Sequence, residues 1–365
     1  MKHIVLSTAL FLACLTVTTR PSNQGELPSV NEITERHLQA LGGREKIDAV
    51  HSVIERLEYR EGSHVNQHAF IARMRPYYKT IGDPKDKNQE INEGYDGSAW
   101  EYYADPGVVI RTVGAAAAAA RHGTEIIDSL VDYKSLGTRI KVVGAETFAG
   151  TPAYKLHVIF ADGFEKDLFV DQQSFLIIGD RRSAPIHAFG APVNSENRIS
   201  DYRSVNGVWF PYSIQEIEIS TGRELNSNTV QSITVNQQLD KSFFSPPEYQ
   251  RTPLQQMLEQ LYLERTDPVC VMWTYRGFRA ANDVDTREGV EFIGYQMAKM
   301  GDFNGAIELL AANAADYPKS ASAEFGLGRA YKAAGNLENA RLHFQKALGI
   351  DPTFRKATDG LDALK

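Results

Sequence analysis

The residues best suited to chemistry in this chain are histidines and carboxylates at short, regular spacings. His64 and His68 are four residues apart, which places both imidazoles on one face of a strand but too far apart to share a metal ion comfortably. Glu216 and Glu218 alternate along a strand and fit a solvated face. The sequence has no nucleophile-elbow, phosphate-loop, dinucleotide-binding or zinc-protease motif. We therefore expect no catalytic residue, no metal site and no cofactor.

The bulk composition is that of an ordinary soluble protein, with 42% hydrophobic and 23% charged residues. A length of 365 residues exceeds what one compact core usually holds, so we expect two domains with additional segments. The formal net charge is −7 and no long basic run occurs, which argues against a nucleic-acid partner.

The N-terminus has the pattern of an export signal. Lys2 and His3 lead into an apolar run over residues 4–13, which is too short to span a membrane even if extended to residue 17. We assign residues 1–20 to the signal and residues 21–29 to a polar tether. The expected location is therefore outside the cytoplasm, in the periplasm or associated with the outer membrane.

Cys14 ends the string Phe-Leu-Ala-Cys, which resembles a bacterial lipobox. Two readings stay open, because Cys14 is either lipidated after cleavage or merely contributes to the apolar run. Membrane association is expected only if Cys14 is lipidated. The other cysteine, Cys270, is distant in the sequence, so no disulfide framework is expected.

The spacing of apolar residues changes from helical to alternating early in the chain. Residues 30–41 have helical spacing and end at Gly42 and Gly43, and a second short helix is expected over residues 44–50. Between residues 52 and 245 the period is two, most clearly over residues 153–160. Glycine-containing turns separate these strands, which predicts a curled or closed antiparallel sheet.

Six consecutive alanines, residues 115–120, interrupt the strands between Gly114 and Gly123. Alanine is the strongest helix former, so this segment predicts a short, slim helix inserted in the sheet domain. It is either a spacer that covers a sheet face or a lid over a concavity. As a lid, it would present the small side chains of Ala115, Ala118 and Ala120.

The predicted strands supply more apolar residues than one sheet face needs. A curled sheet must fill its concave side with side chains, a helix or a guest molecule. Most of these residues are expected in an ordinary core, while some could line a cavity for an acyl chain, at about 0.8 kcal/mol per buried methylene. The candidate lining residues are Trp100, Tyr102, Leu156, Val158, Leu168, Val170 and Phe210.

Residues 287–365 repeat at a spacing of 34, which is typical of helix–turn–helix repeats. Small residues at fixed positions allow paired helices to approach closely, and a proline ends the second helix. Between this segment and the sheet, residues 248–286 form a predicted helical connector, with a helix over residues 254–263 and an irregular helix over residues 266–286 that packs on the repeats. The consensus positions are Gly294, Ala306, Pro318, Gly328, Tyr331, Ala340 and Pro352.

Several strings in residues 30–247 resemble the outer-membrane lipoprotein-sorting (LolA/LolB-like) half-barrels. The strings span residues 37–47, 96–100, 130–134, 143–156, 162–163, 170–171 and 201–211. The resemblance implies a curved antiparallel sheet around helices, open on one side, whose hollow shelters lipid chains without catalysing a reaction. Such carriers lack a repeat domain, so we expect a more general binder of a lipid, acyl or other hydrophobic ligand.

Residues 287–365 resemble tetratricopeptide repeats, with two units followed by a cap helix. This resemblance implies a protein partner. The sequence therefore predicts an α+β fold, in which a curved antiparallel β half-barrel with inserted helices precedes an α-helical repeat domain. The leading hypothesis is a non-enzymatic binder of a hydrophobic ligand and a protein. The alternatives are an interaction scaffold with a filled β-domain and, more weakly, a hydrolase.

Overall fold

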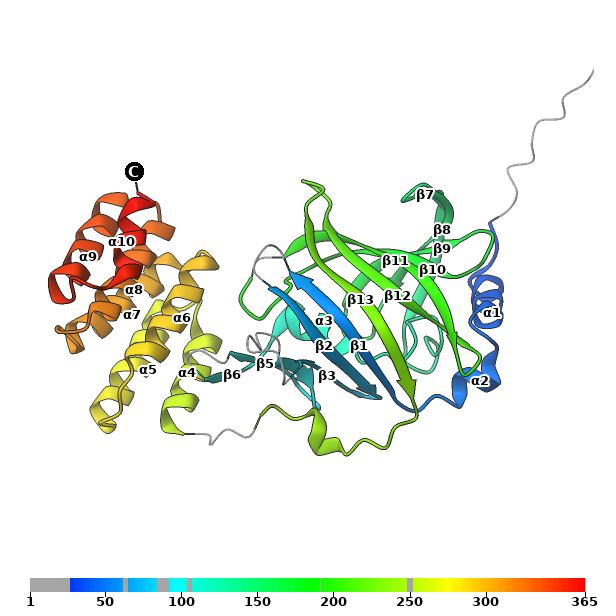
Figure 1. Cartoon of the computed structure of the whole chain (residues 1–365), viewed down its shortest axis with the longest axis horizontal. Helices are drawn as coiled ribbons and strands as arrows, with labels where there is room; N and C mark the ends of the chain where they lie inside the picture. Colours follow the sequence, from blue (N-terminus) through cyan, green and yellow to red (C-terminus); the bar gives the residue numbers. More distant parts are fainter. Residues whose placement is uncertain are drawn as a thin grey trace, which may run out of the picture.

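The computed structural model describes residues 27–61, 65–83, 92–103, 107–190, 192–247 and 252–364. A curved antiparallel sheet is followed by a helical module, which confirms the predicted α+β class (Figure 1). The predicted export signal, most of the tether and Cys14 lie outside the described residues. No described helix is long and apolar enough to cross a membrane.

Two short helices precede the sheet. The first, α1 (Val30–Ala40), begins at Ser29, whose hydroxyl oxygen accepts a hydrogen bond from a first-turn backbone N–H. The second, α2 (Arg44–Asp48), follows a glycine break. Gly42 has a φ of +120°, and a Cβ there would lie 2.0 Å from the carbonyl oxygen of Gly207. Only glycine therefore lets the chain turn this closely against the sheet.

The described strands form one sheet in which all paired neighbours are antiparallel. Their order is β6-β5-β4-β3-β2-β1-β13-β12-β11-β10-β9-β8-β7. The strands are β1 (Val53–Glu61), β2 (Val65–Met74), β3 (Tyr77–Gly82), β4 (Asn92–Tyr95), β5 (Ala99–Tyr103), β6 (Val108–Arg111), β7 (Arg139–Phe148), β8 (Thr151–Ile159), β9 (Glu165–Asp171), β10 (Ile177–Ala184), β11 (Val193–Val205), β12 (Val208–Glu218) and β13 (Glu224–Val235).

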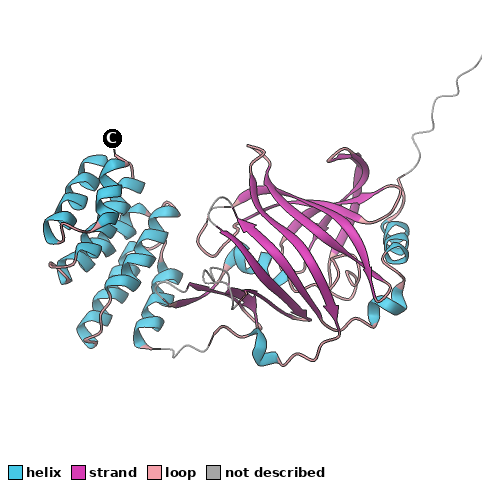
Figure 2. Ribbon diagram, in the orientation of Figure 1, coloured by secondary structure: helices cyan, strands magenta, loops and turns pink. Residues whose placement is uncertain are grey.

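This order consists of two runs of consecutive strands that meet where β13 pairs with β1. β6 and β7 form the two ends of the order, so the curved sheet stays open (Figure 2). The inserted helix α3 (Gly114–His122) lies in the hollow, where it contacts β4, β5 and β10 (Figure 1). The predicted half-barrel with inserted helices is therefore confirmed.

Two apolar clusters fill most of the sheet's buried surface. One joins α1 and α2 to β1, β2, β12 and β13. The other lies over β8, β9 and β10 and includes Ile33 of α1 and Leu130 of the segment after α3. These clusters fix the curvature of the sheet at its centre and at its β7 end.

A short 3-10 helix, η1 (Lys241–Phe244), connects the sheet to the helical module. The first residues of α4, α6 and α8 lie 34 residues apart, so the helical pairing extends one pair upstream of the recognised repeats. The helices are α4 (Pro253–Glu264), α5 (Pro268–Ala281), α6 (Arg287–Lys299), α7 (Phe303–Asp316), α8 (Ala321–Ala333), α9 (Leu337–Ile350) and α10 (Arg355–Asp362).

The consensus residues occupy close helix contacts. A Cβ at Gly294 would lie 2.5 Å from Leu310, and a Cβ at Gly328 would lie 2.6 Å from Phe344. Both repeat alanines, Ala306 and Ala340, are completely buried. The two repeat prolines, Pro318 and Pro352, each follow a helix end by two residues, and Tyr331 stacks on His343 with ring centroids 5.3 Å apart.

The connector has the helix expected over residues 254–263, as α4, but its second helix, α5, is not irregular. α5 is regular over its whole length, because Asp267 caps it and Pro268 opens its first turn. α4 packs against the sheet as well as against the repeats. Gln255 of α4 donates from its side-chain amide to the carbonyl oxygen of Val109 on β6, at 2.7 Å. This contact covers the edge strand of the half-barrel.

The half-barrel and the helical module share one core. Phe189, in the segment between β10 and β11, packs on three rings that come from β5, α4 and α6. Val108 and Ile110 of β6 belong to the same buried cluster as the helical residues. The module is therefore anchored on the sheet. The three rings are Tyr103, Tyr262 and Phe292.

Candidate functional site

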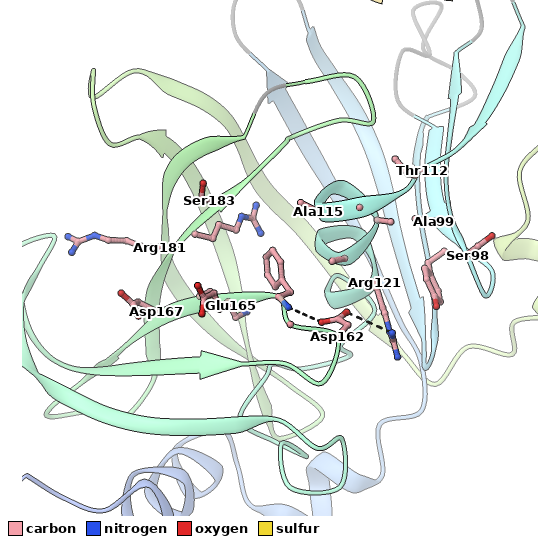
Figure 3. A pocket seen from close by; sticks show the side chains of 18 of the residues that line it. Ser98, Ala99, Thr112, Ala115, Arg121, Asp162, Glu165, Asp167, Arg181 and Ser183 are labelled. Carbon is pink, nitrogen blue, oxygen red and sulfur yellow. Dashed lines mark hydrogen bonds and ion pairs between the residues drawn. The ribbon is translucent and has the colours of Figure 1, made fainter. Parts of the chain in front are cut away.

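A cavity of about 780 Å³ opens between α3 and the sheet (Figure 3). We call it the larger cavity. Its lining comes from β5, α3, β9, β10 and the turn between β8 and β9. A second, smaller cavity of about 450 Å³ is lined by strands β1 to β5, β10, β12 and β13, by the segment of residues 185–189, by the other face of α3, and by α6. Clefts of this size accommodate small organic ligands.

The alanine helix separates the two cavities. Its alanines 115, 117 and 118 line the larger cavity, and its alanines 116, 119 and 120 line the smaller one. Larger side chains on either face of this helix would occupy the adjacent space. Of the three alanines nominated from the sequence, Ala115 and Ala118 thus adjoin the larger cavity and Ala120 the smaller one.

One end of the larger cavity is closed by a charged turn between β8 and β9 (Figure 3). Asp162 accepts hydrogen bonds from the backbone N–H of Phe164 at 3.1 Å and from His122 at 3.0 Å, and it lies 3.8 Å from Arg121. Burial alone would raise the pKa of Asp162, but these hydrogen bonds and charges hold it below its usual value. The turn therefore carries a carboxylate that α3 already neutralises.

The other charges of the larger cavity come from β9 and β10. Arg182 pairs with Glu216 at 3.1 Å, while Arg181 pairs with Glu196 at 2.9 Å. The ammonium group of Lys166 lies 5.5 Å from the centroid of a phenylalanine ring. The larger cavity thus has an apolar wall of alanines and a charged rim. This combination suits an amphiphile better than a purely apolar chain.

The lining residues predicted from the strands fall into two groups, one at a cavity and one in the apolar clusters. Trp100 and Tyr102 line the smaller cavity. The other five are buried in the apolar clusters and line neither of these two cavities, since they pack against other side chains of the protein. These five are Leu156, Val158, Leu168, Val170 and Phe210.

The smaller cavity contains a set of polar groups that the sequence analysis did not identify. Three glutamates each accept a hydrogen bond from a tyrosine hydroxyl. His187 lies among them, with Nε2 3.0 Å from Glu61 and Nδ1 3.8 Å from Glu101. The three pairs are Glu61 with Tyr59, Glu93 with Tyr78, and Glu101 with Tyr103.

The electrostatics of this cluster favour a positive charge at His187. Burial alone would lower the pKa of His187, but hydrogen bonding to Glu61 and the charges of the neighbouring glutamates raise it to about 10. Burial raises the pKa of Glu101, whereas for Glu61 the effect of burial is outweighed by His187 and the pKa is lowered. The smaller cavity therefore contains several carboxylates, whose negative charge is partly offset by the protonated imidazole of His187.

Sequence separation explains why this cluster was missed. Glu61 and His187 are 126 residues apart and meet only because the segment between β10 and β11 crosses toward β5. Glu93 and Glu101 are direct partners across the β4–β5 pair. The sequence signal that could have pointed to this cluster is the placement of Glu93 and Glu101 at matched positions of the β4–β5 hairpin.

The sequence offered His64 and His68 as a pair of possible metal ligands. His68 is exposed on β2, and His64 lies outside the described residues.

A family model agrees with the resemblance of the C-terminal residues to tetratricopeptide repeats. A tetratricopeptide repeat family model matches residues 297–358. Solved structures similar to this chain include an outer-membrane lipoprotein-sorting protein domain from Vibrio parahaemolyticus, with 12% identity, 60% of this chain and 96% of that chain covered, and a TM-score of 0.41. No curated protein matches the chain.

A LolA superfamily protein from Nitrosomonas europaea gives similar values, with 12% identity, 60% and 98% coverage and a TM-score of 0.41. A DUF1329 family protein from Desulfovibrio piger has 10% identity, 59% and 97% coverage and a TM-score of 0.37.

Proposed function

We propose that this chain is a non-enzymatic protein of the bacterial cell envelope that binds an amphiphile, such as a lipid or acyl group, in the larger cavity. The observation that carries the proposal is the juxtaposition of Ala115, Ala117 and Ala118 with a charged rim around about 780 Å³ of space. An acyl chain would lie along the alanines, and a polar head group would meet Lys166 or Arg121.

A cavity-filling substitution tests this proposal. Ala118→Trp would occupy the space beside α3, so we expect at least tenfold weaker uptake of a fluorescent fatty acid by the full chain. Ala280→Trp, on the exposed surface of α5, is the matched control and should leave uptake unchanged. Mass spectrometry of organic extracts from gently purified protein would identify the bound species. An empty cavity together with no uptake would contradict the proposal.

The helical module would bind a protein partner, as its repeats suggest. Part of its surface is already occupied within the chain, because α4 and α6 pack on the half-barrel. A partner would therefore contact the end of the module around α8 and α9. Substitution of exposed residues there should weaken capture of a partner without changing fatty-acid uptake, whereas loss of both would indicate unfolding.

The alternative of a scaffold with a filled β-domain finds less support, because two cavities adjoin α3. The hydrolase alternative also finds little support. Within the described part of the chain, no serine or cysteine is hydrogen-bonded to a histidine, so the usual activated nucleophile is not seen there. Turnover of ester or peptide libraries that disappears in one histidine variant would revive the hydrolase. The proposed periplasmic or outer-membrane location, and any lipid on Cys14, would be tested by mass spectrometry of the mature N-terminus.

A further inference from the structure

We propose that Glu93, Glu101 and His187 form a binding site for a divalent transition-metal ion, with Zn²⁺ as the best match. One ligand atom from each residue lies within 4.8 Å of the other two. Ligands of a tetrahedral zinc ion lie about 2.0–2.2 Å from the metal. Each of the three ligand atoms would therefore move about 1 Å toward a metal ion at their centre. The three side chains would thus shift toward one another when the metal binds.

The sheet register gives independent support for a cation here. Glu93 and Glu101 are direct cross-strand partners on β4 and β5. Like charges at directly opposed positions destabilise a sheet unless a cation lies between them. In addition, the side-chain oxygens of Asn92 and Asn228, which line the same cavity, are buried and have no hydrogen-bond partner among the residues that the structure describes. Water bound to a metal ion at this position would offer hydrogen-bond donors to these two oxygens.

Hydrogen bonds to neighbouring groups hold His187 and Glu101 close to one another. The hydrogen bond between His187 Nε2 and Glu61 leaves Nδ1 directed toward Glu101. The backbone N–H of Ala188, at 2.6 Å, and the hydroxyl of Tyr103, at 2.5 Å, both donate to Glu101. Carboxylate and hydroxyl groups in such outer positions fix the tautomer and direction of metal ligands.

The donor set decides the class of metal. One imidazole nitrogen with two carboxylate oxygens suits Zn²⁺ or Mn²⁺, whereas Ca²⁺ prefers a cage made only of oxygens. Binding at Nδ1 of His187 would release the proton carried there, and Nε2 would keep its proton and its bond to Glu61.

The expected consequence is structural. The metal would tie the segment of residues 185–190 to β4 and β5, which lie near the opposite end of the strand order from β10. Hydrogen exchange of that segment should therefore become slower in the presence of Zn²⁺.

Isothermal titration of the metal-stripped full chain with ZnCl₂, MnCl₂ and CaCl₂ tests the proposal. We expect one zinc ion per chain, binding at least 100-fold weaker in His187→Asn and Glu101→Gln, and binding that is 10- to 100-fold weaker with unchanged stoichiometry in Glu61→Gln. His343→Asn is the matched control, because His343 pairs with Glu324 at 2.7 Å in the helical module. Circular dichroism checks that each variant is folded, and Glu93→Gln replaces any variant that is not.

Three outcomes would overturn the site. These are the lack of saturable zinc binding, equal zinc binding by wild type and His187→Asn, and tighter binding of Ca²⁺ than of Zn²⁺. None of them bears on the ligand of the larger cavity, which is measured separately by fatty-acid uptake.

Discussion

His37 of α1 and Asp128, in the segment after α3, form a buried ion pair with 2.9 Å between Nε2 and Oδ2. The Nδ1 atom of His37 lies 2.7 Å from the carbonyl oxygen of Phe175. Both partners are acceptors, so both ring nitrogens must carry protons and the imidazole is positively charged. This pair joins the N-terminal helix to the segment that follows α3 and to the turn after β9.

The pair predicts a pH window for the stability of the half-barrel. Burial alone would lower the pKa of His37, but Asp128 and the Phe175 carbonyl raise it above 6.5. Its contribution to the free energy of unfolding is therefore complete below pH 6.5 and is lost as the pH rises through the raised value. Burial alone would raise the pKa of Asp128, but His37 lowers it below 3.8, so that contribution is lost as the pH falls through the lowered value.

The measurement compares urea unfolding of wild type and His37→Gln, followed by near-ultraviolet circular dichroism. We expect His37→Gln to cost about 3 kcal/mol between pH 4 and 6.5, since it leaves Asp128 without its buried partner. The difference should shrink at pH 3 and at pH 9. A difference that stays constant across this range would show that the pair is not ionised. His157→Gln, whose side chain is one-third exposed, serves as the control.

Local patterns predicted several elements of the fold. The helical spacing over residues 30–41 corresponds to α1, the alternation over residues 153–160 corresponds to β8, and the six alanines form α3. Each of these signals depends on neighbours within one element. The connector was less clear, because the exposed Val269 and Trp273 obscure the apolar face of α5.

The composition of the site could not be predicted in the same way. Alternation shows that Leu156 and Val158 face inward, but not whether protein or a guest covers them, and here protein covers them. The acidic cluster depends on a crossing of the segment that carries His187 toward β5, which no local pattern encodes. Period-two spacing fixes the face of a residue, while long-range packing decides what that face contacts.

The repeat glycines predict opposite effects for two substitutions to alanine. At Gly294 a new Cβ would lie 2.5 Å from the buried Leu310, so Gly294→Ala should destabilise the helical module by about 1–3 kcal/mol through overpacking. At Gly349 an added Cβ would meet no described atom within 4 Å apart from its chain neighbours and the backbone of its own helix, and Gly349→Ala should stabilise α9 by about 0.5–1 kcal/mol. Thermal unfolding of both variants checks the difference. Equal effects would show that the helices do not need the close approach.

Gly42 and Gly43, at the break between α1 and α2, are expected to differ in how well they tolerate alanine. Gly42 has a φ of +120°, and the Cβ of Gly42→Ala would lie 2.0 Å from the Gly207 carbonyl oxygen. Gly43 has a φ of +96°, but the Cβ of Gly43→Ala would have no described atom within 4 Å apart from those of its chain neighbours. Gly42→Ala should therefore cost more stability than Gly43→Ala, which bears only the backbone cost of about 1–2 kcal/mol. Urea unfolding measures both values. A larger loss for Gly43→Ala would mean that the contact with Gly207 relaxes freely.

Phe189 predicts how strongly the two modules are coupled. Its ring lies 5.0 Å from that of Tyr262 and 5.6 Å from that of Phe292, so Phe189→Ala removes the centre of the shared core. We expect a loss of about 3 kcal/mol and a separation of the calorimetric transition into two, because the half-barrel and the helices would then unfold independently. Trp273→Ala is the control, since Trp273 is 78% exposed and its removal should change stability by less than about 0.5 kcal/mol. A single transition at the wild-type temperature in Phe189→Ala would show that β6 and α4 alone hold the modules together.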